Sequence, residues 1–159
     1  MLTRTDFDRN TENLNRDGNV RIDSTIVCSE KKSTYRYSNN SQRRVAKIKI
    51  DGGLIAAQDR EKCDWLLVNW GDGISFFIEL KGSDLFKAIS QITSTIRQIW
   101  NDLSTLNDSP VTTANARIVL SKNQWPQYRN DSRYKQFEKI IKQTNGDVRI
   151  EAQQMQEQC

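Results

Sequence analysis

A short turn between two apolar runs constrains the fold of this chain more than any other feature. The turn is Trp70-Gly71-Asp72-Gly73, a composition typical of a tight β-hairpin. The runs on either side, residues 63–69 and 75–81, are apolar enough to lie near the middle of a sheet. The sequence therefore predicts an antiparallel hairpin whose register is set by the turn.

Further elements follow from periodicity. Residues 45–50 alternate apolar and polar positions and predict a strand. Residues 84–103 predict a long helix with one apolar stripe, formed by Leu85, Ile89, Ile92, Ile96, Ile99 and Leu103. A strand over 116–120, a helix over 134–143 and a strand over 148–150 complete the order. This order predicts a single α/β domain with a mixed sheet, an antiparallel hairpin at one side and crossover helices packed on the sheet.

The two ends of the chain are polar. Residues 1–42 are expected to form an N-terminal extension with a short helix over 6–15, a short strand over 20–27 and a loop over 33–41. Residues 43–152 are the expected core. The glutamine-rich residues 153–159 are expected to be a flexible tail or a helix that lies on another surface.

Composition excludes several kinds of chemistry. The chain has no histidine, which removes Ser-His-Asp and Cys-His catalysis and histidine metal sites. Its three cysteines are too far apart for a zinc knuckle and fit a reducing compartment. Catalysis must then use carboxylates, lysine, tyrosine or a hard metal held by oxygen atoms. The net charge of +4 favours a polyanionic partner such as nucleic acid.

Two further observations bear on location. No apolar run approaches the ~20 residues that a membrane span requires, and the first residues lack the apolar region of a signal peptide. The sequence therefore predicts a cytoplasmic protein without a membrane partner.

The hairpin register brings charged residues together. With the turn centred between Gly71 and Asp72, Asp64 lies opposite Glu79, because each is equally far from the centre. Opposed residues share a sheet face, and Lys81, two positions along, shares it as well. Two apposed carboxylates repel one another unless a divalent cation lies between them. A slip of one residue would place the two acids on opposite faces.

Asp64 and the segment Glu79-Leu80-Lys81, on two strands followed by a helix, resemble the PD-(D/E)XK nuclease superfamily. The resemblance covers about residues 43–120 and extends to small Holliday-junction resolvases and phage-defence nucleases. It implies a restriction endonuclease-like fold that hydrolyses phosphodiester bonds with Mg²⁺, for which Mn²⁺ can substitute.

The resemblance also implies roles for individual residues. Asp64, Glu79 and the main-chain carbonyl of Leu80 would bind the metal, and oxygen ligands suit Mg²⁺. Lys81 would orient the attacking water or stabilise charge on the phosphate. Gln91 on the long helix would bind phosphate or water. A further acid common in the family has no clear counterpart, and its candidates are Glu12, Glu30 and Asp51.

Structural alternatives stand beside these roles. Glu79 and Lys81 can form an ion pair on a wet sheet face, Asp64 can simply begin a strand, and Gln91 can be a helix-surface amide. Arg43, Arg44, Lys47 and Lys49 form one basic cluster that contacts phosphate or is only solvated. A second basic region has the same two interpretations, and Trp125 and Tyr128 within it either stack on bases or pack at the end of the sheet. Its basic residues are Lys122, Arg129, Arg133, Lys135, Lys139 and Lys142.

These observations predict a metal-dependent endonuclease or exonuclease, with DNA favoured over RNA as substrate. Phage defence, restriction and DNA repair are the processes that such an enzyme serves. A homodimer is expected if both strands of a duplex are cut, and a larger partner protein is the other arrangement. The alternative function is a catalytically degenerate subunit that binds nucleic acid or a partner within a larger nuclease or defence complex.

Overall fold

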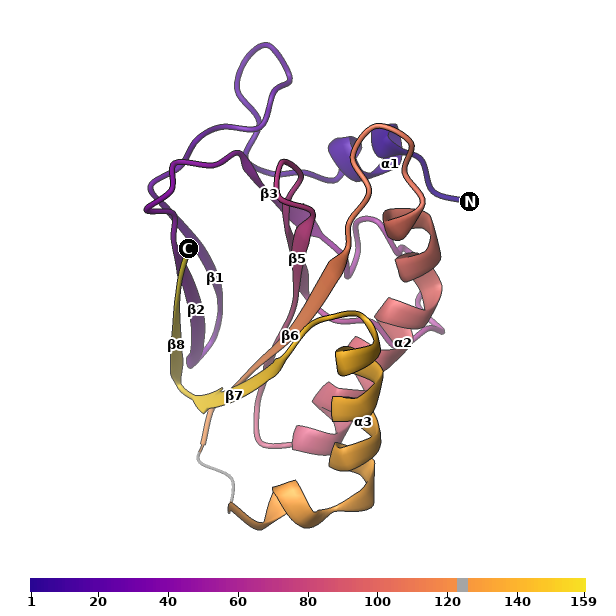
Figure 1. The fold of residues 1–159 in the computed structure, drawn as a ribbon. Coiled ribbons are helices and arrows are strands. Elements are labelled where there is room, and N and C mark those ends of the chain that lie inside the picture. Colours follow the sequence, from indigo (N-terminus) through magenta and orange to yellow (C-terminus); the bar gives the residue numbers. More distant parts are fainter. Residues whose placement is uncertain (123–125) are drawn as a thin grey trace.

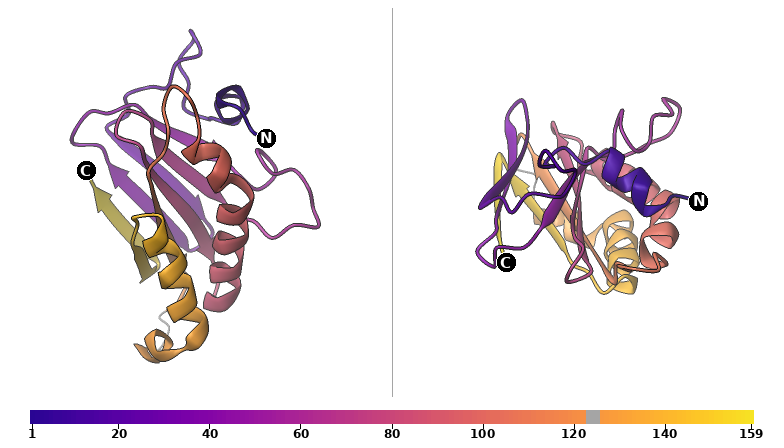
Figure 2. Two further views of the ribbon diagram at one scale, coloured as in Figure 1. Left: turned by 45° about the vertical axis from the view of Figure 1, so that its right-hand side comes forward. Right: turned by 90° about the horizontal axis from the view of Figure 1, so that it is seen from above.

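A computed structural model describes residues 1–122 and 126–159, and the chain folds into three layers (Figure 1). A central five-stranded sheet has the order β3-β4-β5-β6-β7. Its strands are β3 (Val45–Lys49), β4 (Trp65–Asn69), β5 (Ile74–Lys81), β6 (Thr113–Leu120) and β7 (Val148–Ala152). Helices α2 (Leu85–Ser104) and α3 (Ser132–Gln143) cover one face, and a second, three-stranded sheet covers the other (Figure 2).

The predicted hairpin and its register are confirmed. Strands β4 and β5 are antiparallel, and their pairs run from Asn69 with Ile74 to Trp65 with Ile78. The turn closes through side chains, since the Asn69 amide donates to Asp72 Oδ2 over 2.8 Å and accepts from the Asp72 backbone N–H over 3.1 Å. Gly73 takes a φ of 67°, which glycine adopts without strain.

The predicted long helix is also confirmed, together with its crossover position. Asp84 caps α2 by accepting the Lys87 backbone N–H over 3.0 Å. All six residues of the predicted apolar stripe are buried. The helix joins β5 to β6, and β5, β6 and β7 run parallel. Because α3 joins β6 to β7, both helices are crossover connections and lie on the same face of the sheet (Figure 1).

The second sheet was not expected from the sequence. It has the order β1-β2-β8 and contains β1 (Thr25–Glu30), β2 (Ser33–Ser38) and β8 (Gln154–Gln158). The prediction of a loop over residues 33–41 is therefore wrong for most of that segment. The glutamine-rich tail was expected to fray or to form a helix, but residues 154–158 form a strand parallel to β2. Helix α1 (Arg4–Arg9) and β1 are both displaced from their predicted positions.

Two apolar layers hold the elements together. The larger layer lies between the central sheet and the helices and includes Phe7 from the N-terminal segment. The smaller layer lies between the two sheets and includes Tyr35, Tyr37 and Met155 beside residues of the central sheet. Residues 1–42 and the C-terminal strand therefore contribute to the buried core, which was predicted to consist of residues 43–152 alone.

The N-terminal segment also covers the open edge of β3. The Asn13 side-chain amide donates to the Val45 carbonyl over 2.8 Å and accepts the Lys47 backbone N–H over 2.8 Å. The Glu12 N–H donates to the Lys47 carbonyl, and the Lys49 N–H donates to the Asn10 carbonyl. These bonds pair backbone groups that an exposed edge strand would leave open to another chain.

A buried ionic cluster attaches β8 to the central sheet. Arg117 on β6 is 3% exposed and binds both carboxylate oxygens of Glu157, over 3.0 and 2.8 Å. It also pairs with Asp147 at 2.9 Å, and Arg149 contacts Glu157 at 2.7 Å. Burial alone lowers the pKa of Arg117, but the hydrogen bonds and charges of Glu157 and Asp147 outweigh it and raise that pKa above its ordinary value.

No helix in the described parts of the chain combines the length and apolar character needed to cross a bilayer.

Candidate functional site

Asp64 and Glu79 lie at the end of the β4–β5 hairpin that is far from its turn. Trp65 and Ile78 form the last pair between the strands, so Asp64 and Glu79 occupy the next position in the same register. At such positions the two Cβ atoms are about 4.5–5.5 Å apart. Alternation places both acids on the face that carries Leu66 and Phe77, which is the face covered by the helices. The structure therefore brings together the two carboxylates that the sequence singled out.

The two carboxylates have different surroundings. Glu79 is 1% exposed, whereas Asp64 is half-buried just before β4 begins. Asp64 Oδ2 accepts the backbone N–H of Leu80 over 2.8 Å, which links the two strands beyond their last ladder pair. The carbonyl of Leu80 is the predicted third oxygen ligand. The hydrogen bond therefore fixes Asp64 to the residue that carries this carbonyl.

Two side chains of α2 hold the backbone that leads into Asp64. Thr95, which is fully buried, accepts the Cys63 N–H over 2.8 Å. Gln91 lies one turn earlier on the same stripe and donates from Nε2 to the Lys62 carbonyl over 3.2 Å. The helix therefore positions Asp64 through its two preceding residues.

Gln91 is the residue of α2 that the resemblance assigned to the site, and its role there stays a prediction. It lines the same pocket as Asp64 and Glu79. Its Nε2 is used by the Lys62 carbonyl, but its Oε1 is buried and has no hydrogen-bond partner among the described residues. A buried amide oxygen without a donor is costly, and it is a position where a bound group is expected.

The pocket around these residues has a volume of about 400 Å³, within the range of small-ligand sites. The β1–β2 turn of the second sheet supplies part of its wall, which the sequence did not predict because that sheet was not foreseen. Its lining residues are Glu30, Lys31, Lys32, Ser33, Asp51, Asp64, Glu79, Leu80, Gly82, Gln91 and Ser121.

Two of the three candidates for an additional acid lie at the pocket, and the third does not. Glu30 and Asp51 line the pocket, whereas Glu12 pairs with Lys47 at 3.6 Å and is not among the lining residues. Asp51 pairs with Lys62 at 3.4 Å. Lys62 was not singled out by its sequence, yet it is 6% exposed and also donates from Nζ to the Ala57 carbonyl. Its burial depends on tertiary packing that no local pattern signals.

The acids influence the nearby thiol of Cys63. Burial is the main reason that the pKa of Cys63 is raised, and the negative charges of Glu79 and Asp64 raise it further. The Cys63 thiol is therefore a neutral, inert group of the buried core.

The donor set suits a hard cation. Asp64, Glu79, the Leu80 carbonyl and Gln91 Oε1 are all oxygen donors, the type that Mg²⁺ and Mn²⁺ prefer. Within residues 1–122 and 126–159, no three or more acidic, cysteine or histidine side chains gather as a metal-binding group. Asp64 and Glu79 are the two charged ligands that the resemblance assigns to this position. Lys81 follows on β5, where its backbone pairs with Leu120 on β6, and its role stays a prediction.

The first basic cluster does not stay together. Lys47 lies over the ring of Trp65, with Nζ 4.2 Å from its centroid, and pairs with Glu12. Arg43 and Arg44 instead line a separate pocket near the hairpin turn. Strand β3 runs antiparallel to β4 and spaces these residues along its length.

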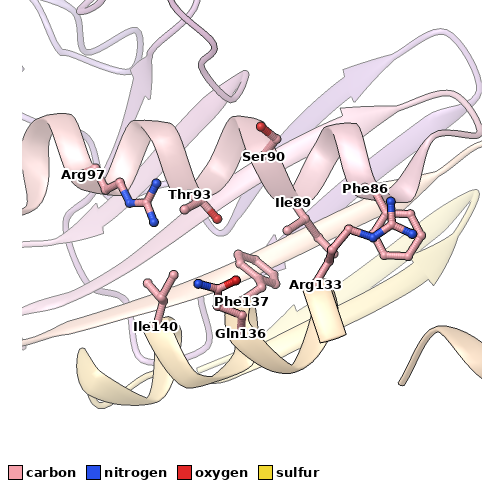
Figure 3. A pocket seen from close by; sticks show the side chains of 9 residues that line it. All are labelled: Phe86, Ile89, Ser90, Thr93, Arg97, Arg133, Gln136, Phe137 and Ile140. Carbon is pink, nitrogen blue, oxygen red and sulfur yellow. The ribbon is translucent and has the colours of Figure 1, made fainter. Parts of the chain in front are cut away.

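Of the second basic region, Arg133 lines a groove between α2 and α3 (Figure 3). The Arg133 guanidinium lies over the ring of Phe86, 3.4 Å from its centroid, and pairs with Asp131 at 2.9 Å. Arg97 on α2 faces the same groove, which has a volume of about 200 Å³. Tyr128 packs edge-on against Tyr134, which agrees with the packing interpretation. Trp125 lies outside the described residues.

Comparison with known proteins finds no matching family model, no matching curated protein and no matching solved structure.

Proposed function

We propose that this protein is a metal-dependent nuclease of the PD-(D/E)XK type, acting on phosphodiester bonds of nucleic acid, with DNA favoured. The observation that carries the proposal is the placement of Asp64 and Glu79 on one face of adjacent strands, at a pocket that also contains Gln91. The order of a hairpin with acids, a crossover helix and a parallel strand is the order that the restriction endonuclease-like fold requires. The second sheet is an addition to that core.

The chain's own residues prepare the site in three ways. The Leu80 N–H fixes the orientation of Asp64, and Thr95 and Gln91 fix the backbone before it. The buried Glu79 carboxylate lies in a low-dielectric environment, where its charge acts strongly on a bound cation. Asp64, Glu79 and the Leu80 carbonyl would hold a divalent metal, which would make a water easier to deprotonate and would neutralise phosphate charge.

The positive groups of the pocket give it a means to bind substrate. Lys31 and Lys32, on the β1–β2 turn, are exposed and line the pocket beside the acids. Phosphate groups are attracted by such lysines, with a strong dependence on salt. Nucleic acid approaching the acids thus meets two cations of the second sheet.

Cleavage with Glu79→Gln beside the native protein tests this proposal. Glutamine keeps the size of the side chain but removes the charge. We therefore expect metal-dependent cutting of DNA to fall at least about 100-fold, the loss typical when one preorganised electrostatic group of an active site is removed. The matched control is Glu138→Gln, the same substitution on the partly exposed face of α3, which should cut normally. Equal cutting by Glu79→Gln and the native protein, in Mg²⁺ or Mn²⁺, would contradict the proposal.

One observation favours the second candidate, a catalytically degenerate binding subunit. Asp51, one of the candidates for an additional acid, pairs with the buried Lys62. Asp64 Oδ2 is likewise used by the Leu80 N–H. If the native chain binds DNA without cutting it in either metal, and Glu79→Gln binds as tightly or more tightly, the binding subunit is the better description.

A further inference from the structure

A second pocket lies at the opposite end of the β4–β5 hairpin, beside the turn. Its volume is about 420 Å³, and it is bordered by Asn69, Trp70, Arg4, Arg43 and Arg44. Asn69 ends β4 and Asp64 directly precedes that strand, so at ~3.3 Å per residue these two residues, one from each pocket, are about 17 Å apart. This pocket is therefore distinct from the acid site, and what is inferred for it does not depend on the proposed nuclease activity.

The charge in this pocket is positive. Every charged side chain among its described lining residues is an arginine. Arg4 pairs with Asp8 at 3.0 Å and Arg43 pairs with Asp72 at 3.4 Å, but both of these acids lie outside the lining. Arg44 contributes a third guanidinium, which contacts the uncharged carbonyl of Val20. Three guanidinium groups with two flanking carboxylates leave a net positive site, suited to planar recognition of phosphate.

Trp70 gives the pocket a rigid wall. It is 8% exposed, packs edge-on against Phe7, and carries the Arg4 guanidinium 3.9 Å from the centroid of its ring. This stacking holds Arg4 in one orientation. The indole N–H is buried and has no hydrogen-bond partner among the described residues, although buried donors are normally satisfied. Trp70 therefore carries a donor whose acceptor is not found among the described residues, and it lines a pocket that three arginines make positive.

The pocket also offers apolar surface. Ile22 lines it and is 51% exposed, which leaves its aliphatic side chain free to contact a ligand. The side-chain amides of Asn19 and Gln42 lie on the same lining and can hydrogen-bond to a base or sugar. An inorganic anion has no apolar surface to bury against Ile22, whereas a nucleotide has both a charged phosphate and an apolar base face.

We propose that this pocket binds a phosphate-bearing nucleotide, either free or as one unit of a nucleic-acid strand. Arg43, Arg44 and Arg4 contact the phosphate. Ile22 contacts the base, and the amides select its polar edge. The site would bind without catalysis, because none of its described lining residues carries a carboxylate and it lies away from the acid pocket.

Binding measured without metal tests the proposal, because no cutting takes place in EDTA. A fluorescent single-stranded DNA is titrated with the full chain at several salt concentrations, and anisotropy reports the dissociation constant. The test variant is Arg43→Ala/Arg44→Ala, both exposed positions. The matched control is Lys135→Ala/Lys139→Ala, which removes the same charge from exposed positions of α3.

We expect the test variant to bind at least about tenfold more weakly and the slope of log K against log salt to fall by about 1.4, since each lost contact with single-stranded phosphate contributes ~0.7. The control should change little. Trp70→Phe keeps an aromatic side chain but removes the indole N–H. It should bind more weakly and still show a cooperative thermal unfolding transition.

The source of the nucleotide is resolved by competition. Displacement of the DNA by a nucleoside monophosphate, lost in the test variant, identifies a site for free nucleotides. Failure of the monophosphate to compete, with the arginine effect intact, identifies a site for a strand. Equal weakening in the test and control variants, or equal displacement by polyglutamate, would overturn the proposal, because the effect would then be one of general charge.

Discussion

Replacing Glu157 by glutamine tests whether the C-terminal strand is an integral part of the fold. Glu157 is 8% exposed and binds the Arg117 guanidinium through both oxygens, while Arg149 contacts it as well. Glutamine has nearly the same shape, but it cannot accept from two guanidinium groups as a charged carboxylate does. The substitution therefore leaves a buried guanidinium without its main counter-charge.

The expected loss of unfolding free energy depends on which partners Arg117 keeps in the variant. Removing one partner of a buried ion pair costs about 3–5 kcal/mol. Arg117 still pairs with Asp147 at 2.9 Å and donates to the carbonyls of Ala116 and Asp147. These remaining partners reduce the expected loss of unfolding free energy to about 2–3 kcal/mol. For a chain of this size, that corresponds to a melting temperature lower by about 5–10 °C.

Thermal and urea unfolding of Glu157→Gln, followed by circular dichroism, measure this loss. Glu151→Gln is the matched control, because Glu151 is an exposed acid on β7 that pairs with Arg149, and it should change stability by less than about 0.5 kcal/mol. The double variant Arg117→Met/Glu157→Met should recover most of the stability, because it removes both buried charges together.

The reasoning is refuted if Glu157→Gln unfolds with the native midpoint, or if the double variant is less stable than Glu157→Gln. The first result would mean that β8 contributes little to folding, and the second that packing outweighs the charges. A consequence for the acid pocket can be measured in the same samples. The Thr34 N–H donates to the Gln153 carbonyl beside the β1–β2 turn, so loosening β8 should also weaken the binding of nucleic acid at that pocket.

Two further predictions concern buried groups. Thr95→Val should lower the unfolding free energy by about 1–3 kcal/mol, because it leaves the buried Cys63 N–H without its acceptor. Urea unfolding measures this loss, with Thr93→Val on the groove side of α2 as the control. Equal stability of the two variants would contradict the prediction. Thiol labelling at mildly alkaline pH should modify Cys159 alone in the folded protein, since burial raises the pKa of Cys28 to about 12 and raises that of Cys63 as well, whereas all three should react in denaturant. More than one labelled thiol in the folded state would show that the apolar layers open.

The hairpin and the long helix could be predicted because their information is local. The turn at Trp70-Gly71-Asp72-Gly73 sets the pairing of β4 with β5, and the pairing places Asp64 opposite Glu79. The apolar stripe of α2 repeats along one face and requires one buried side. In both cases the structure depends on residues close together in the chain, so the local sequence is sufficient to predict it.

The second sheet could be read only in part. Tyr35 and Tyr37 are buried and alternate with more exposed residues on β2, a period-two signal of a strand. The surrounding serines and asparagines made that segment look like a loop. Strand β8 has a single apolar residue, Met155, and its other inward position is Glu157, whose burial makes sense only beside Arg117.

The sequence by itself determined the central hairpin, its register, the crossover helix and the pair of acids that the register brings together. Only the tertiary structure decided how the two ends of the chain combine into a second sheet, that Lys62 becomes buried beside Asp51, and that Arg43 and Arg44 form a pocket with Trp70. The physical reason is the range of the interactions. A turn and an amphipathic stripe act between neighbours, whereas parallel pairing and buried ion pairs join residues that lie far apart in the chain.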